Sequence, residues 1–208
     1  KAFKNCTSLK VIIIPTSVKK IEPYAFFCCS SLTNISLPST IDIINESVFS
    51  GCTSLTKITI PSSVEQIKQN AFCGCTSLTQ IDIPFVKYFD FGCFKNCTSL
   101  KTISIPSTES RLYETFAGCS SLEQITIPYS VYVIGAETFK DCSSLVKIKM
   151  LSSIEIIGDK AFAGCSSLKQ ITIPSSVESV GNDAFSGCSS LVEISIPRAC
   201  DQTLIGIP

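Results

Sequence analysis

The sequence repeats itself every 22 or 23 residues along almost all of its 208 residues. Each copy starts at a cysteine and continues as C-[TS]-S-L-x-x-I-x-[IL]-P, as in residues 52–61 and 165–174. A unit this short cannot bury an apolar face alone, so successive copies must stack on one another. These nine marker residues, called the register cysteines, are Cys6, Cys29, Cys52, Cys75, Cys97, Cys119, Cys142, Cys165 and Cys188.

Each copy predicts the same local structure. The L-x-x-I-x-I stretch ends in the alternation of a half-buried strand, and the following Pro ends that strand. A second apolar pair, such as Val64 and Ile67, predicts a second short extended segment, and an [AVCT]-F pair then supplies a Phe to the core. Because every strand is reached by the same crossover, the strands must be parallel and the crossovers right-handed. We predict one domain over residues 1–208, a right-handed β-rich solenoid with a parallel sheet of nine short strands, in which residues 198–208 form a degenerate tail or cap.

Composition excludes several function classes. Lys plus Arg and Asp plus Glu number 17 each, so there is no basic excess for nucleic acid. The longest aliphatic run, Val11 to Ile14, ends at Pro15, far short of the ~20 residues of a membrane span. With no His, Ser-His-Asp and Cys-His sites and His-containing zinc sites are excluded. We therefore predict no catalytic residue, no cofactor, no metal site and no enzymatic activity.

The register cysteines have two interpretations, a disulfide or metal ladder and a column of buried thiols. Side chains at one repeat position point the same way from rungs ~4.8 Å apart. A disulfide needs converging Cβ atoms ~3.8 Å apart, and a zinc site needs tetrahedral convergence. The pattern therefore favours free thiols that act as small apolar core residues. Of the extra cysteines, Cys93 and Cys200 are expected in the core, and Cys28 and Cys73 are expected as free thiols in turns.

Aromatic side chains gather in the two 22-residue repeats and the repeat after them. Phe85 and Tyr129 replace the Ser or Thr that usually follows the strand-ending Pro. Tyr88 and Tyr132 each lie 13 residues after a register cysteine. Phe91 and Tyr113 each lie six residues before one. Such residues beside an Arg are typical anchors of a protein interface. Equally, the shortened repeats could pack differently and use the extra rings as filling. The predicted partner-binding residues are Phe85, Tyr88, Phe91, Arg111, Tyr113, Tyr129 and Tyr132.

The outward positions of the predicted strands form a polar stripe, as at Lys147 and Lys149. No Trp, Tyr or Arg stands in this stripe, and such residues are the usual anchors of an interface. The pattern favours a solvated face over a ligand platform.

The motif L-x-x-I-x-I-P-x-S-V-x-x-I-x-x-x-A-F-x-G-C-S-S resembles the BspA-type (Treponema pallidum-type) leucine-rich repeat family over residues 1 to about 198. The resemblance implies a leucine-rich repeat solenoid. It also implies a surface protein of bacteria or parasitic protists that acts as an adhesin, with a host matrix protein, a host cell-surface protein or another microbe as partner. The implied location is the cell surface or the exterior.

The cysteine content supports an alternative, because many unpaired thiols favour a reducing compartment. The alternative function is an intracellular, cytoplasmic scaffold for protein–protein interaction. The chain also starts inside a repeat, so we expect a piece of a longer protein whose open ends favour end-to-end or side dimers.

Overall fold

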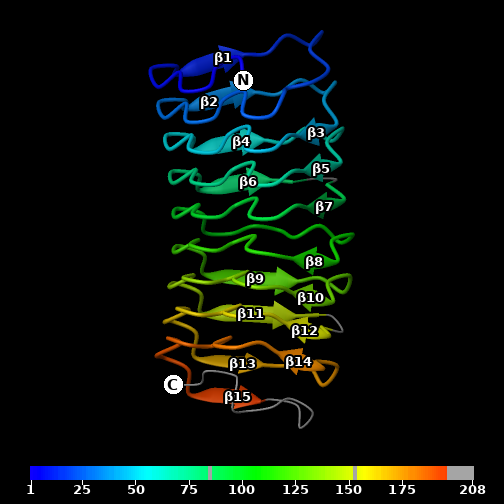
Figure 1. Ribbon diagram of the computed structural model, residues 1–208, viewed down its shortest axis with the longest axis vertical. Helices are drawn as coiled ribbons and strands as arrows, with labels where there is room; N and C mark the ends of the chain where they lie inside the picture. The colour runs from blue at the N-terminus through cyan, green and yellow to red at the C-terminus, as the bar shows by residue number, and fades with distance from the viewer. Residues whose placement is uncertain (84–85, 152–153, 196–208) are drawn as a thin grey trace.

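The computed structural model describes residues 1–83, 86–151 and 154–195, which form a solenoid of rungs stacked in chain order (Figure 1). Each full rung presents its strands in two columns. The first column contains β1 (Val11–Ile13), β2 (Asn34–Ser36), β4 (Lys57–Thr59), β6 (Gln80–Asp82), β9 (Gln124–Ile127), β11 (Lys147–Met150), β13 (Gln170–Thr172) and β15 (Glu193–Ser195). The second column contains β3 (Ile43–Ile44), β5 (Gln66–Ile67), β7 (Tyr88–Phe89), β8 (Arg111–Leu112), β10 (Val133–Ile134), β12 (Ile156–Ile157) and β14 (Ser179–Val180).

Every described strand pair is parallel, which confirms the predicted pairing. The first column consists of the pairs β1–β2, β4–β6, β9–β11 and β13–β15, and the second of the sheets β3–β5–β7 and β8–β10–β12–β14. Each ladder joins equivalent positions of successive repeats, as Ile12 joins Ile35 and Ile58 joins Ile81. The repeat period therefore sets the register directly. None of the described segments is a helix long and apolar enough to cross a membrane.

The prediction of nine first-column strands is wrong by one within the described residues. Residues 102–104 follow the first shortened repeat and form no strand between β6 and β9. Ile103 and Ile105 still point into the core and are buried. The apolar side chains therefore keep this rung packed although its backbone forms no strand.

A column of phenylalanines forms the centre of the core. Neighbouring rings from Phe3 to Phe185 stack with centroids 5.3 to 6.0 Å apart and planes within 19° of parallel. The widest step joins Phe94 to Phe116, where Phe89 packs edge-on against both rings. Offset stacking of this kind adds to the large apolar area that each ring buries. The repeats are thus joined by ring-to-ring contact along the whole solenoid.

The column predicts that its middle members matter more than its end member. Phe116 is fully buried between two rings, whereas Phe3 is 37% exposed at the first rung. Phe116→Ala should lower the free energy of unfolding by about 3–5 kcal/mol, because it leaves a cavity between two repeats. Phe3→Ala should cost only about 1 kcal/mol, because much of its ring already meets water. Urea unfolding of both variants measures this, and equal losses would contradict the stacked-core description.

Candidate functional site

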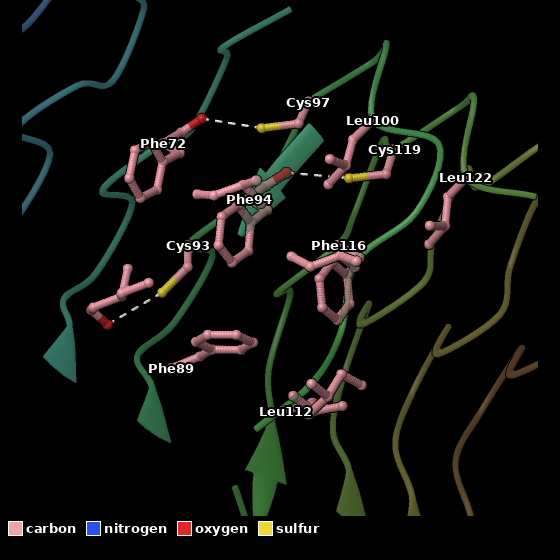
Figure 2. Close-up of a cluster of buried hydrophobic side chains, with 14 of the residues drawn as sticks. Phe72, Phe89, Cys93, Phe94, Cys97, Leu100, Leu112, Phe116, Cys119 and Leu122 are labelled. Carbon is pink, nitrogen blue, oxygen red and sulfur yellow. Dashed lines mark hydrogen bonds between the residues drawn. The ribbon is translucent and has the colours of Figure 1, made fainter. Parts of the chain in front are cut away.

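Eight of the nine register cysteines are fully buried, from Cys29 to Cys188. Each of these thiols donates a hydrogen bond to the carbonyl oxygen of a Phe in the preceding repeat, with Sγ···O distances of 3.0 to 3.2 Å. Figure 2 shows Cys97 and Cys119 pointing at the carbonyl oxygens of Phe72 and Phe94. The thiols therefore link neighbouring repeats.

Burial keeps these thiols in the protonated form that can donate. Loss of solvation raises the pKa of Cys52 and Cys119 to about 12 and that of Cys188 to about 11. The pKa values of Cys75, Cys97, Cys142 and Cys165 are raised well above the ordinary thiol value for the same reason. Because the thiolate is the reactive form, these sulfurs are chemically inert at neutral pH.

Cys6 departs from the predicted buried column, because it lies exposed at the first rung of the structure. Cys28 and Cys73 are half-buried in turns, and Cys93 is buried and donates to the Asp90 carbonyl at 2.7 Å. Cys200 lies outside the described residues. All cysteines in the described part of the chain are free thiols, and no group of three potential metal ligands occurs there.

Sequence reasoning missed the donor role of the register thiols and treated them as apolar filling. The signal was present in the spacing, because every register cysteine follows a core Phe by three residues, as Cys119 follows Phe116. That spacing places the Phe carbonyl of one repeat within reach of the thiol of the next.

Thiol alkylation checks this arrangement. In the native protein, iodoacetamide should modify Cys6 fastest and Cys28 and Cys73 more slowly, while the eight buried register cysteines and Cys93 stay unmodified. After denaturation without reductant, all 13 cysteines should react. Mass spectrometry of the labelled peptides measures both states. Native labelling of Cys119 at the rate of Cys6, or any disulfide, would contradict the thiol column.

The predicted aromatic residues lie mainly along the second column. Tyr88 in β7, Phe91 and Tyr113 are 38, 40 and 41% exposed. Tyr132 is half-buried, and Tyr129 is 77% exposed in the turn between β9 and β10. Phe85 lies outside the described residues. We call Tyr88, Phe91, Arg111, Tyr113 and Tyr132, which come from three successive repeats, the aromatic–arginine patch.

Arg111 and two tyrosines form the fixed centre of this patch. The Arg111 Nε donates a hydrogen bond to the Tyr132 hydroxyl at 2.6 Å, and the Arg111 guanidinium lies 5.2 Å from the centroid of the Tyr132 ring. The hydrogen bond to Tyr132 is the main reason that the pKa of Arg111 is raised, with a smaller contribution from Tyr113. Tyr113 lies over Gly135, where an added Cβ would come within 2.1 Å of the Tyr113 ring. Gly135 therefore makes room for this ring.

The structure corrects one alignment within the patch. Tyr88 and Tyr132 share an offset of 13 residues from their register cysteines, but they occupy different rung positions. Tyr88 is the register partner of Gln66 in the preceding repeat, and Arg111 is the register partner of Val133 in the following repeat. Tyr88 therefore occupies the rung position of Arg111 and Val133, which is one residue after that of Tyr132. The 22-residue repeat that begins at Cys75 lacks a residue before Tyr88. The equal count from the register cysteine therefore does not place Tyr88 and Tyr132 at the same position of the rung. The Tyr88 ring instead meets the Lys68 ammonium, 5.6 Å from its centroid.

A buried carboxylate beside the patch was not predicted. Glu109 stands where other repeats carry an apolar residue such as Val64 or Val131, and it is only 2% exposed. Its side chain accepts hydrogen bonds from the backbone N–H groups of Phe89, Ser110 and Arg111, the last two at 2.8 and 3.1 Å. These bonds take N–H groups that a β7–β8 ladder would use, so the second column divides at this point.

Burial raises the pKa of Glu109, and its three N–H donors oppose the shift. Between pH 4.5, the ordinary pKa of a Glu side chain, and the higher pKa of Glu109 in the folded protein, the folded chain keeps a proton on Glu109 that the unfolded chain releases. The contribution of this group to stability is fully present below that value and is lost as the pH rises through the folded-state pKa.

Glu109→Gln should remove this pH dependence. The free energy of unfolding of the natural chain should fall relative to that of the variant as the pH rises from about 4 to about 8. Denaturant unfolding across this range measures the difference, with the exposed Glu123→Gln as control. A constant difference between the natural chain and Glu109→Gln would refute the raised pKa.

Comparisons with known proteins agree with the architecture. The profile of the family described as BspA type leucine rich repeat region matches residues 1–115 and 112–205, with six copies. A leucine-rich repeat protein of T. pallidum is similar at 28% identity, over 76% of this chain and 77% of that one, with a TM-score of 0.68. A leucine rich cell surface protein of Faecalibacterium prausnitzii shares 30% identity over 96% of this chain and 70% of that one, with a TM-score of 0.57.

The pneumococcal vaccine antigen PcpA shares the fold, at 19% identity over 95% of this chain and 58% of that one, with a TM-score of 0.57. A comparison with curated proteins gives no match.

Proposed function

Because the chain belongs to the BspA-type leucine-rich repeat family, we propose that it is the protein-binding module of a cell-surface adhesion or host-interaction protein. One comparison supports the surface location, because the F. prausnitzii relative is described as a cell surface protein. The proposed partner is a protein of the host matrix, of a host cell surface or of another cell.

The observation that carries the proposal is the aromatic–arginine patch. Interface hot spots are enriched in Tyr and Arg, and the patch presents both on a rigid scaffold. Arg111 is held by Tyr132, and Tyr113 lies on Gly135, so few rotamers need to be ordered on binding. A preordered group of this kind is suited to binding a protein surface. We propose that Tyr129, which is also exposed, extends this surface.

The role proposed is binding without catalysis. Leucine-rich repeats typically act as non-enzymatic binding scaffolds, and both Arg111 in the patch and Glu109 beside it have structural partners. Glu109 holds three backbone N–H groups, and Arg111 holds a tyrosine hydroxyl. Neither arrangement pairs a nucleophile with a base, which acyl or phosphoryl transfer would need.

A second candidate function is an intracellular protein-binding scaffold. The observation that favours it is the free state of all cysteines in the described part of the chain, Cys6 and Cys28 included. Accessible thiols persist most readily in a reducing compartment. In this case the same patch would bind a cytoplasmic protein.

Binding to purified collagen, laminin and fibronectin and to cultured epithelial cells tests the proposal. The natural chain should bind at least one of these probes. The variant Tyr88→Gln, Arg111→Gln, Tyr132→Gln should lower the affinity roughly 10- to 100-fold, because it removes the polar-tipped anchors of the patch. Biolayer interferometry measures the affinity for the matrix proteins.

Ile156→Gln is the matched control, because Ile156 occupies the Arg111 position two rungs further on and is 42% exposed. It should bind as the natural chain does. Equal binding by the patch variant would refute the patch, and failure of the natural chain with every probe would refute the adhesion role.

A further inference from the structure

Two shallow hollows lie on the first column, one on each side of β11. The first, of about 460 Å³, opens between the strandless rung at 102–104 and β11. The second, of about 840 Å³, opens between β11 and β13. Lys147 and Lys149 line both hollows, and Lys169 lines the second. The polar groups beside them are amides and hydroxyls, namely Thr102, Ser104, Gln124, Thr126, Gln170 and Thr172.

The charge of these hollows is of one sign. Every charged residue that lines them is a lysine, although the whole chain has a net charge of zero. All three lysines are exposed, and the ion pairs found within the described residues involve other lysines. Among the described residues, carboxylates lie at the margins, where Asp82 of β6 stands beside the strandless rung, Glu123 precedes β9 and Glu193 begins β15. The three ammonium groups therefore form no ion pair within the described residues and are open to a ligand.

The side chains at the outward positions of three neighbouring strands indicate the ligand class. Lysine, glutamine and threonine all donate hydrogen bonds, and they recur along the solenoid axis every ~4.8 Å. None of the described residues that line the two hollows is aromatic, so this part of the surface lacks the usual anchors of a protein interface. Lysine ammonium groups act as hydrated point charges, which suits a strongly hydrated anionic polymer with regularly spaced charges.

We infer that the first-column surface over β9, β11 and β13 binds an extended anionic polysaccharide, whose sulfate or carboxylate groups contact Lys147, Lys149 and Lys169. The Gln and Thr side chains donate to its hydroxyl and ring oxygens. This site is separate from the aromatic–arginine patch of the second column, and it does not depend on the protein partner proposed above.

Titration calorimetry with a heparin dodecasaccharide at low salt tests the inference. The natural chain should bind, and binding should weaken as salt is added, because exposed charge pairs are screened. The double variant Lys147→Gln, Lys149→Gln should bind about tenfold more weakly, since each exposed ion pair contributes modestly. Thermal melting confirms that the variant folds.

The matched control is the double variant Lys10→Gln, Lys57→Gln. It removes the same charge from exposed lysines of the same column, in the first and third repeats, and should bind as the natural chain does. Equal losses in both variants would show that overall charge alone drives binding and would overturn the site. Absence of heparin binding, or equally tight and equally Lys147-dependent binding of poly-glutamate, would overturn the polysaccharide assignment.

Discussion

The hydrogen bond from a buried thiol to a phenylalanine carbonyl of the preceding repeat is the contact on which this solenoid depends. The same Phe also donates its backbone N–H to a carbonyl of the next repeat, as Phe94 donates to the Thr115 carbonyl while its own carbonyl accepts the thiol of Cys119. The Phe94 ring stacks between the rings of Phe72 and Phe116. Each repeat is thus joined to its neighbours by a thiol, an amide and a ring that are only three residues apart in sequence. Stability therefore resides in the interfaces between repeats, which is why a unit of 22–23 residues suffices.

Irregularity of the repeats is confined to places that leave this contact intact. The first shortened repeat lacks a residue before Tyr88, and the second lacks one between Leu112 and Phe116, yet the thiols of Cys97 and Cys119 still reach their carbonyls. Glu109 and the lost strand at 102–104 accompany these changes. The exposed aromatic side chains stand in the same region. The regular core therefore allows surface chemistry to vary in the middle of the solenoid, on both columns.

Much of the fold follows from the repeat because a constant period fixes which residues meet. The parallel ladders and the placement of Ile58 opposite Ile81 are direct consequences of equal spacing. The predicted positions of side chains are wrong where a repeat has 22 residues and not 23. A count from the register cysteine does not reveal where in such a repeat the residue is missing, and it therefore aligns Tyr88 with Tyr132 incorrectly. Glu109 was missed because an acidic residue at an apolar position is revealed only by the backbone N–H groups around it. The first hollow beside Lys147 was missed because it borders a rung, at residues 102–104, whose strand fails to form.

Raman spectroscopy of the S–H stretching band tests the thiol–carbonyl contact most directly, because a hydrogen-bonded S–H bond vibrates at a lower frequency than a free one. The native protein should show a main band shifted to lower frequency, with a minor component from Cys6, and denaturation without reductant should return the whole band to the position of a solvated thiol. A native band already at the solvated position, or one missing through disulfide formation, would contradict the account, because the repeats would then be joined without the thiol column.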